Sequence, residues 1–172
     1  MGRVLVTGRP GVGKTTLTLR VVDALRERGH DPAGFVTGEI RRGGRRTGFT
    51  VTGLRSGAEH LLAVDGGPGP RVGRYGVDVD AFESVALNEL EAGLDLGAVL
   101  VADEIGKMEL LSVRFCDLLP AVFEARRLLA TVQAHRHPVT DELKRRPDVH
   151  VLRLARDIPD GLVEALVARV ES

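Results

Sequence analysis

The sequence predicts an α/β fold in three layers: a mainly parallel sheet with helices on both faces and an antiparallel hairpin inserted in it. Short apolar segments of strand length alternate along the chain with longer segments whose apolar residues recur at helical spacing. A length of 172 residues suggests a single domain over residues 1–172, with a core large enough to be stable alone. A glycine pair beside a segment of alternating polarity supplies the hairpin.

The chain opens with a predicted strand–turn–helix unit. Residues 4–6 form a short apolar run that stops at a glycine-rich turn, as a buried strand would. Leu17, Val21 and Leu25 then recur at helical spacing. Gly29 ends this helix, because glycine is favoured just past a helix carboxyl terminus.

A segment rich in predicted strands follows. Residues 33–37 form a second strand, and Gly43-Gly44 separates it from an alternating stretch over 49–52, which predicts a β-hairpin. Residues 61–64 add a further short strand. Residues 65–79 hold five glycines and two prolines, so we expect a loop there.

The second half of the chain continues the alternation. Asp80 is expected to cap a helix whose apolar face runs from Phe82 to Leu90. The remaining predicted elements are a strand over 98–102, a helix capped by Ser112 that Pro120 kinks or splits, a strand over 128–132, a short helix after Pro138, a strand over 149–154 and a last helix opened by Pro159.

Charge and cysteine content limit the classes of function. Twenty-four basic residues balance twenty-four acidic ones, which argues against a protein that coats nucleic acid or an anionic membrane. The single cysteine, Cys116, excludes an intramolecular disulfide. The first strand starts too early for a signal peptide, and no apolar run reaches the roughly 20 residues that span a bilayer. These features favour a cytoplasmic location and leave the oligomeric state open.

The turn after the first strand carries a phosphate-binding motif. Its pattern over residues 8–15, G-x-x-x-x-G-K-T, is that of a P-loop, in which glycines let the backbone wrap a phosphate at a helix amino terminus. Lys14 is expected to reach the β- and γ-phosphates, and the Thr15 hydroxyl to ligate Mg²⁺. The alternative is a plain glycine turn before a helix. The residues predicted to bind a nucleoside triphosphate are Gly8, Arg9, Pro10, Gly11, Val12, Gly13, Lys14, Thr15 and Thr16.

The use of lysine at position 14 supports this prediction. The chain has three lysines and twenty-one arginines, so arginine is its general-purpose cation. A compact ammonium fits among phosphates where a planar guanidinium would not. Lysine at this one position therefore favours phosphate binding.

Two carboxylates follow the predicted strand over 98–102. Asp103 stands where a second Mg²⁺ ligand is expected, at the carboxyl edge of the sheet beside the P-loop. Glu104 is placed to polarise an attacking water. With Gly106 the segment also fits the D-x-x-G of switch GTPases, whose glycine amide contacts the γ-phosphate, but no guanine-reading N-K-x-D motif follows. The alternative for the pair is a solvated acidic turn.

Three further groups of polar residues have two interpretations each. Gln133 follows the strand over 128–132, and its amide either contacts the γ-phosphate or a water, or satisfies loop backbone groups. The arginines within 41–46 either clamp phosphates or nucleic acid, or form a solvated turn, which we favour. The loop around Tyr75 either closes over the nucleotide, with the ring on the base and an arginine at the phosphates, or is a mobile connector.

Together these motifs resemble a known family, the small nucleoside-triphosphatases also called cancer-related nucleoside-triphosphatases. The resemblance covers nearly the whole chain, and its last segment is much more specific than a P-loop alone. Four segments carry it: the P-loop at 8–15, Gly34-Phe35-Val36-Thr37-Gly38-Glu39-Ile40-Arg41 with the hairpin through Phe49, Gly73-Arg74-Tyr75-Gly76-Val77-Asp78-Val79 with Phe82-Glu83, and Asp103-Glu104-Ile105-Gly106-Lys107-Met108-Glu109.

The resemblance implies an activity and some of the residues that carry it. Family members hydrolyse several nucleoside triphosphates, ATP and GTP among them, to diphosphates in a Mg²⁺-dependent reaction with loose base selection. The resemblance supports Glu104 as the catalytic carboxylate and places Lys107 near the phosphates. One departure is Ala155, which precedes Arg156-Asp157 where family members often have asparagine. Any polar contact of that asparagine is missing here.

Two other functions fit parts of the pattern. A nucleotide or small-molecule kinase needs an acceptor pocket and a lid, and only the loop at 65–79 offers a lid. A nucleotide-switched module that acts on RNA or DNA is weakened by the neutral net charge and by an aromatic content of 3%. We therefore predict hydrolysis of nucleoside triphosphates by water. The predicted catalytic residues are Lys14, Glu104 and Lys107, and the predicted Mg²⁺ ligands are Thr15 and Asp103.

Overall fold

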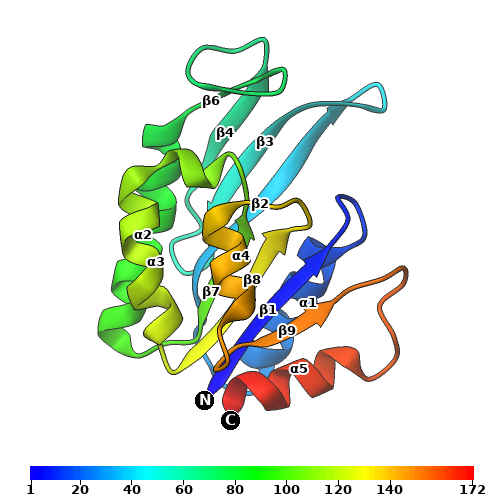
Figure 1. Ribbon diagram of the computed structural model, residues 1–172, viewed down its shortest axis with the longest axis vertical. Helices are drawn as coiled ribbons and strands as arrows, with labels where there is room; N and C mark the ends of the chain where they lie inside the picture. Colours follow the sequence, from blue (N-terminus) through cyan, green and yellow to red (C-terminus); the bar gives the residue numbers. More distant parts are fainter.

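The computed structural model describes residues 1–172 and contains one nine-stranded mixed sheet with helices on both faces, which confirms the predicted fold class (Figure 1). Its strands are β1 (Gly2–Gly8), β2 (Ala33–Arg42), β3 (Arg45–Gly53), β4 (Glu59–Asp65), β5 (Arg71–Val72), β6 (Tyr75–Val77), β7 (Leu100–Ile105), β8 (Arg127–Gln133) and β9 (His150–Arg153). Its helices are α1 (Lys14–Glu27), α2 (Val79–Leu96), α3 (Val113–Glu124), α4 (Pro138–Arg145) and α5 (Leu162–Glu171), with one 3₁₀ turn at Glu109–Leu111. None of the helices is both long and apolar enough to cross a membrane.

The order of the strands determines where polar residues meet. β2, β7, β8, β1 and β9 pair in parallel in that order, and β3, β4, β6 and β5 extend the sheet from β2 by antiparallel pairing. Gly8 at the end of β1 is the register partner of Gln133 at the end of β8. Asp103 of β7 is the register partner of Val36 of β2. The carboxyl ends of the parallel strands therefore meet along one edge of the sheet.

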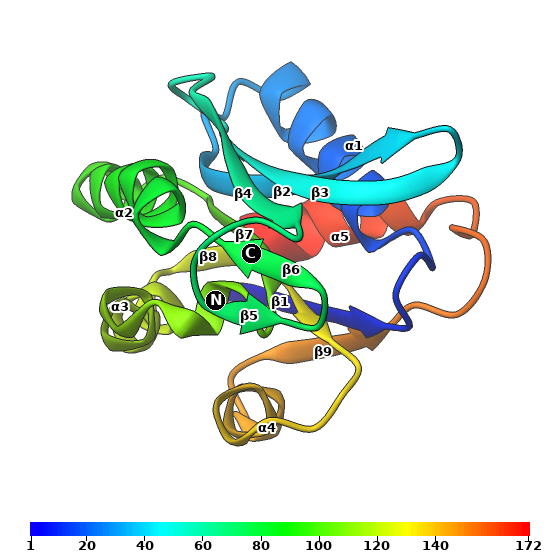
Figure 2. The same cartoon turned by 90° about the horizontal axis from the view of Figure 1, so that it is seen from above.

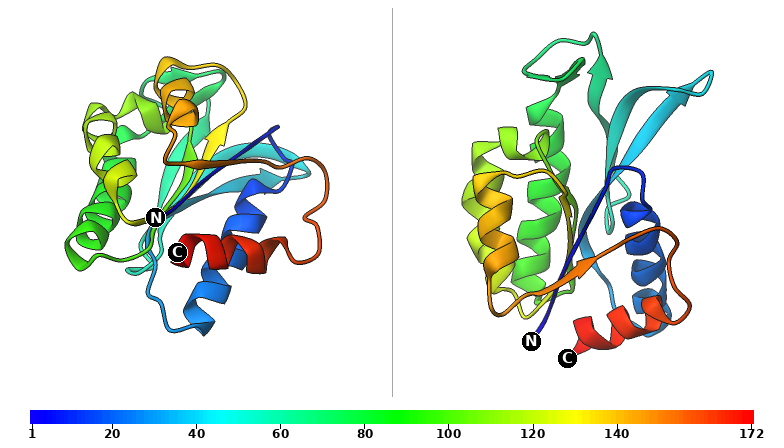
Figure 3. Two further views of the ribbon diagram at one scale, coloured as in Figure 1. Left: turned by 60° about the horizontal axis from the view of Figure 1, so that its bottom comes forward. Right: turned by 45° about the vertical axis from the view of Figure 1, so that its right-hand side comes forward.

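Two hydrophobic cores hold the sheet between the helices. Helices α2, α3 and α4 lie on one face and α1 and α5 on the other (Figures 2 and 3). In the first core the rings of Phe35, Phe82 and Phe115 meet edge to face, with centroids 5.2 to 5.8 Å apart. In the second core Leu17 and Val21 of α1 are fully buried against the strands. Each such buried side chain contributes about 1.5–3 kcal/mol of transfer free energy to folding.

The predicted hairpin is confirmed, and it projects past the parallel strands. β2 pairs with β7 only as far as Val36, continues to Arg42 and turns through Gly43-Gly44 into β3. Both glycines have positive φ, 57° and 75°, as the turn requires. Figure 1 shows the hairpin standing beyond the level at which β1 ends.

The prediction of a loop over residues 65–79 is partly wrong. Within it β5 and β6 form a short antiparallel ladder, and β6 pairs with β4. Gly73, with φ 57°, makes the turn between the two short strands. Strands of two and three residues carry too few side chains to give a periodic signal, so the glycines concealed them.

Some helix ends differ from prediction. Asp78, and not Asp80, caps α2 by accepting a first-turn amide at 2.9 Å. Ser112 caps α3 as predicted, because its hydroxyl oxygen accepts a hydrogen bond from the Phe115 N–H at 3.0 Å. Pro120 lies within α3, which continues through it as one helix. Pro159 does not open the last helix, because α5 begins three residues later, after a glycine in the left-handed region.

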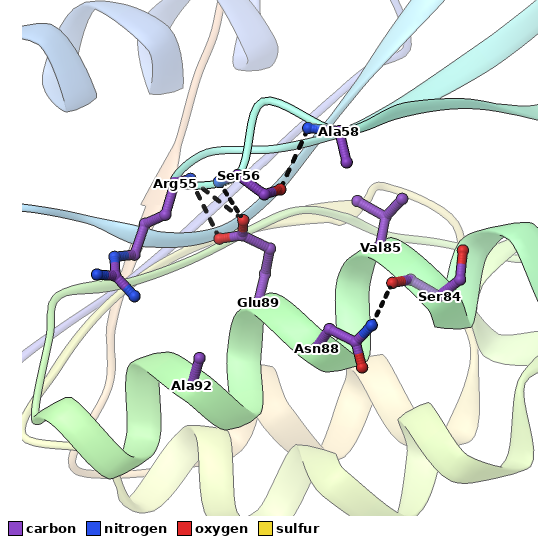
Figure 4. A pocket seen from close by; sticks show the side chains of 8 residues that line it. All are labelled: Arg55, Ser56, Ala58, Ser84, Val85, Asn88, Glu89 and Ala92. Atoms are coloured by element: carbon purple, nitrogen blue, oxygen red, sulfur yellow. Dashed lines mark hydrogen bonds between the residues drawn. The ribbon is translucent and has the colours of Figure 1, made fainter.

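Glu89 ties α2 to the turn between β3 and β4. Its buried carboxylate accepts the backbone N–H groups of Gly34, Arg55 and Ser56 at 2.7–3.2 Å. Figure 4 shows the side chain reaching from the helix to the turn, on the wall of a pocket. Burial raises the pKa of the Glu89 carboxyl, but the hydrogen bonds from these groups outweigh it and hold the pKa below its ordinary value.

We expect Glu89→Gln to lower the free energy of unfolding at pH 7 by about 2 kcal/mol, because an amide NH₂ cannot accept these donors. The contribution of Glu89 is fully present above the unfolded-state pKa of about 4.3, and it is lost as the pH falls through the lower folded-state value. The difference in the free energy of unfolding between wild type and variant, measured by urea denaturation, should therefore become smaller towards acid pH. Glu91→Gln, an exposed site on the same helix, is the control. Equal losses in both variants would refute the role of Glu89.

Candidate functional site

The predicted strand–loop–helix arrangement is present at the end of β1. Gly11 and Gly13 have φ values of 76° and 107°, which side-chain-bearing residues rarely adopt. At Gly8 a Cβ would lie 2.8 Å from the Leu154 carbonyl oxygen and 2.9 Å from a Val12 methyl. The glycines are thus required by the path of the backbone, and α1 starts directly at the loop.

The Lys14 side chain joins this loop to β7. It is 7% exposed, and its Nζ donates to the carbonyl oxygens of Gly8 and Arg9 at 3.0 and 3.3 Å. The same Nζ lies 3.3 Å from Glu104 Oε2. A single ammonium therefore links the P-loop backbone to the second predicted motif, as expected if both act on one ligand.

Asp103 lies inside β7 and is fully buried. The Thr131 hydroxyl donates to its Oδ1 at 2.6 Å, and its Oδ2 has no hydrogen-bond partner. Burial raises the pKa of the Asp103 carboxyl to about 6, although interactions with the Thr131 and Thr15 hydroxyls lower it and Glu104 raises it further. A buried carboxylate oxygen without a partner, next to a second hydroxyl, suits a hard cation. Asp103 and Thr15 fit the predicted Mg²⁺ site in this respect.

The turn after Glu104 is held by side chains from outside it. The Gly106 N–H donates to Glu109 Oε2 at 3.1 Å, and the Lys107 N–H donates to Gln133 Oε1 at 3.1 Å. In the D-x-x-G interpretation the glycine amide would contact the γ-phosphate, but here Glu109 occupies it. The Lys107 side chain is exposed and makes no ion pair, so its predicted place near the phosphates stays a prediction.

Glu109 is a buried acidic residue beside Glu104 for which the sequence predicted no role. Its carboxyl is buried, and a Cβ at Gly106 would lie 3.1 Å from Glu104 Oε1 and 3.2 Å from Glu109 Oε2. Burial and the neighbouring Glu104 raise the pKa of Glu109 to about 8, so this carboxyl is mostly neutral at pH 7. In the sequence Glu109 is only the last residue of the segment that begins at Asp103, and the burial that makes it unusual is not visible there.

The residues around Tyr75 are not arranged for a lid. The Tyr75 side chain is 6% exposed. Its hydroxyl oxygen accepts hydrogen bonds from Arg46 Nε and from a guanidinium nitrogen of Arg74, each at 2.9 Å. The Arg46 guanidinium also lies 5.0 Å from the centre of the Phe49 ring and pairs with Glu39 at 3.1 Å. The stacking of Tyr75 on a base is therefore contradicted, because the ring and both arginines fasten β6 to the hairpin.

Comparisons with known proteins agree with this geometry. Residues 3–167 match the model of the NTPase family. The chain is 41% identical over 170 residues to the nucleoside-triphosphatase THEP1 of Methanopyrus kandleri, covering 97% of this chain and 94% of that protein. It is 37% identical over 167 residues to the nucleoside-triphosphatase THEP1 of Thermotoga petrophila, and the match covers 96% of this chain and 90% of that protein.

Two solved structures share the fold. The crystal structure of THEP1 from the hyperthermophile Aquifex aeolicus superposes with a TM-score of 0.87 at 33% identity and covers 99% of both chains. The solution structure of a human cancer-related nucleoside triphosphatase gives a TM-score of 0.76 at 34% identity and covers 99% of this chain and 96% of that one. Both likenesses extend over the P-loop edge and the hairpin alike.

Replacing Glu109 with Gln should change how stability depends on pH. The unfolded chain loses the Glu109 proton near pH 4.3 and the folded chain only near pH 8, so wild type loses stability between these values. Glutamine does not titrate and can still accept the Gly106 N–H. Urea denaturation without nucleotide measures the difference in the free energy of unfolding between variant and wild type. This difference should shift in favour of the variant by about 3–4 kcal/mol between pH 5 and 8. Glu164→Gln, an exposed change on α5, is the control. If the difference in the free energy of unfolding between Glu109→Gln and wild type does not change with pH, the carboxyl is not buried in its neutral form.

Proposed function

The chain belongs to the NTPase family whose model it matches and is a nucleoside-triphosphatase, and we propose that it converts several nucleoside triphosphates to diphosphates and phosphate in a Mg²⁺-dependent reaction. The observation that carries the proposal is the Lys14 ammonium between the P-loop carbonyls and Glu104, beside the buried Asp103. Phosphate-binding and water-activating groups meet there. The predicted cytoplasmic location stays a prediction.

The roles of the residues follow from their chemistry. The loop amides and Lys14 bind the β- and γ-phosphates and offset negative charge that develops during transfer. Asp103 and the Thr15 hydroxyl hold Mg²⁺, which supplies further charge neutralisation at the phosphate oxygens when bound. The half-buried Glu104 carboxylate orients a water and accepts its proton as the water oxygen bonds to the γ-phosphorus and the bond to the β–γ bridging oxygen breaks.

Loose base selection is supported by what the site lacks around the P-loop. The one tyrosine of the chain is engaged by Arg46 and Arg74, so no tyrosine ring is left to stack on a base. Leu154 donates its N–H to the Thr7 carbonyl at 2.8 Å, which places the following Ala155 near the start of the P-loop. Alanine there offers no side-chain hydrogen bond to a base or ribose. Recognition then rests on the triphosphate.

Phosphate release from ATP, GTP, CTP, UTP and ITP, with no acceptor added, tests the function. We expect wild type to release phosphate from several of them, and EDTA to abolish release. Glu104→Gln should reduce turnover by about 100-fold or more while nucleotide still binds, because the general base is gone. Lys14→Ala should lose binding as well as turnover. Wild-type protein that binds nucleotide but releases phosphate only with an added acceptor would favour a kinase instead.

Thr131→Val tests the Mg²⁺ site separately. The change removes the hydrogen bond that orients the Asp103 carboxylate. We expect the Mg²⁺ concentration for half-maximal hydrolysis to rise by about 10-fold, the usual effect of losing a partner that supports a metal ligand. Thr131→Ser keeps the hydroxyl and is the matched control. If serine and valine behave alike, the hydroxyl does not support the metal site.

A further inference from the structure

Gln133 occupies a position from which it can reach the reacting end of the site. It is the last residue of β8 and the register partner of Gly8, the first residue of the P-loop. It lies two residues after Thr131, whose side chain reaches Asp103. Since strand side chains alternate with period two, Gln133 lies on the same face of the sheet as Thr131 and Asp103. That face carries α1 and the P-loop.

The orientation of the Gln133 amide is determined by its neighbour. The Lys107 N–H donates to the side-chain oxygen at 3.1 Å, and a donor requires an acceptor opposite it. The other end of the amide is therefore the NH₂ group. The side chain is 7% exposed, and its Nε2 is buried without any hydrogen-bond partner. Buried amide donors without an acceptor are uncommon, and satisfaction of loop backbone groups does not explain this one.

Each of the three lysines of the chain donates a hydrogen bond to Gln133 or to Gly8, its register partner on β1. Lys107 binds the side chain through its backbone N–H, and Lys144 Nζ of α4 donates to the Gln133 carbonyl oxygen at 3.1 Å. Lys14 binds the carbonyl oxygen of Gly8. Gln133 is thus held at both its main chain and its side chain, and its side-chain NH₂ is left without an acceptor. A donor held in this way is preorganised for a ligand.

We propose that Gln133 donates its side-chain N–H to the γ-phosphoryl group of the bound nucleotide, with Lys144 as a positioning residue behind it. The proposal rests on the proposed function and adds a contact that recognises the triphosphate specifically. Only the γ-phosphoryl group lies at the reacting end, so the contact distinguishes substrate from the diphosphate product. It also strengthens as charge develops on the γ-phosphoryl oxygens during transfer.

Gln133→Ala and Gln133→Glu test this contact by kinetics and by binding. We expect Gln133→Ala to lower kcat by about 10- to 100-fold. Its affinity for a non-hydrolysable ATP analogue should fall by about 10-fold, while its affinity for ADP stays within a factor of two of wild type. Gln133→Glu should lower kcat and the affinity for the ATP analogue further, because a carboxylate replaces the donor and repels the phosphate. A merely structural role would weaken both ligands equally and lower the melting temperature.

Lys144→Met tests the support behind Gln133, with the exposed Arg145→Met on the same helix as control. Lys144→Met should lower kcat about 3- to 10-fold and add nothing in the Gln133→Ala background, since both changes act through one amide. If wild type is active and Gln133→Ala keeps its kcat and its preference for the analogue over ADP, the inference is overturned and the proposed function stands. If wild type releases no phosphate, the proposed function fails. The ratio of the affinities for the ATP analogue and for ADP, compared between wild type and Gln133→Ala, still decides the role of Gln133.

Discussion

The parallel pairing of three neighbouring strands, β7, β8 and β1, brings the main polar residues of the site together at the carboxyl ends of these strands. The end of β1 becomes the P-loop, the end of β7 bears Asp103 and Glu104, and the end of β8 bears Gln133. Parallel pairing brings these ends to one edge of the sheet, although the register between β7 and β8 shifts between Ala102 and Ile105. Residues far apart in the sequence meet there as a result. The two helical layers hold the strands in place by burying apolar side chains on both faces.

Burial sets the electrostatics of this edge. Asp103 and Glu104 lie near the Lys14 ammonium, and the Glu109 carboxyl lies close to both of these carboxyl groups. Taking charges out of water is costly, and the structure limits that cost by raising the pKa of Glu109, which favours its neutral form, and by giving Asp103 a hydroxyl partner. The remaining negative charge favours a cation at Asp103. The same burial makes the pKa values of Asp103 and Glu109 higher than those of ordinary carboxyl groups.

The extension of the sheet beyond β2 uses its arginines in a different way. Arg46 lies against the rings of Phe49 and Tyr75, pairs with Glu39 and donates to the Tyr75 hydroxyl. Arg74 donates to the same hydroxyl and to the Arg46 carbonyl oxygen. Planar guanidinium groups suit such stacked and forked contacts. Arginine therefore serves structural contacts in this part of the protein, whereas the ammonium groups of Lys14 and Lys144 donate to carbonyl oxygens at the ends of β1 and β8.

The sequence by itself determined the fold class, the P-loop, the β2–β3 hairpin and the acidic pair, because each depends on local spacing: apolar periodicity, glycines at a turn, or a carboxylate at a strand end. The cap of α2, the strands β5 and β6 and the engagement of Tyr75 did not follow from the sequence. Those features depend on which groups meet in space. Only the tertiary structure decided that Glu109 is buried beside Glu104, that Glu109 and Gln133 accept hydrogen bonds from two consecutive backbone amides, and that the Gln133 NH₂ is buried without an acceptor. Burial and long-range contact change the chemistry of a side chain, and neither is visible in the spacing of residues along the chain.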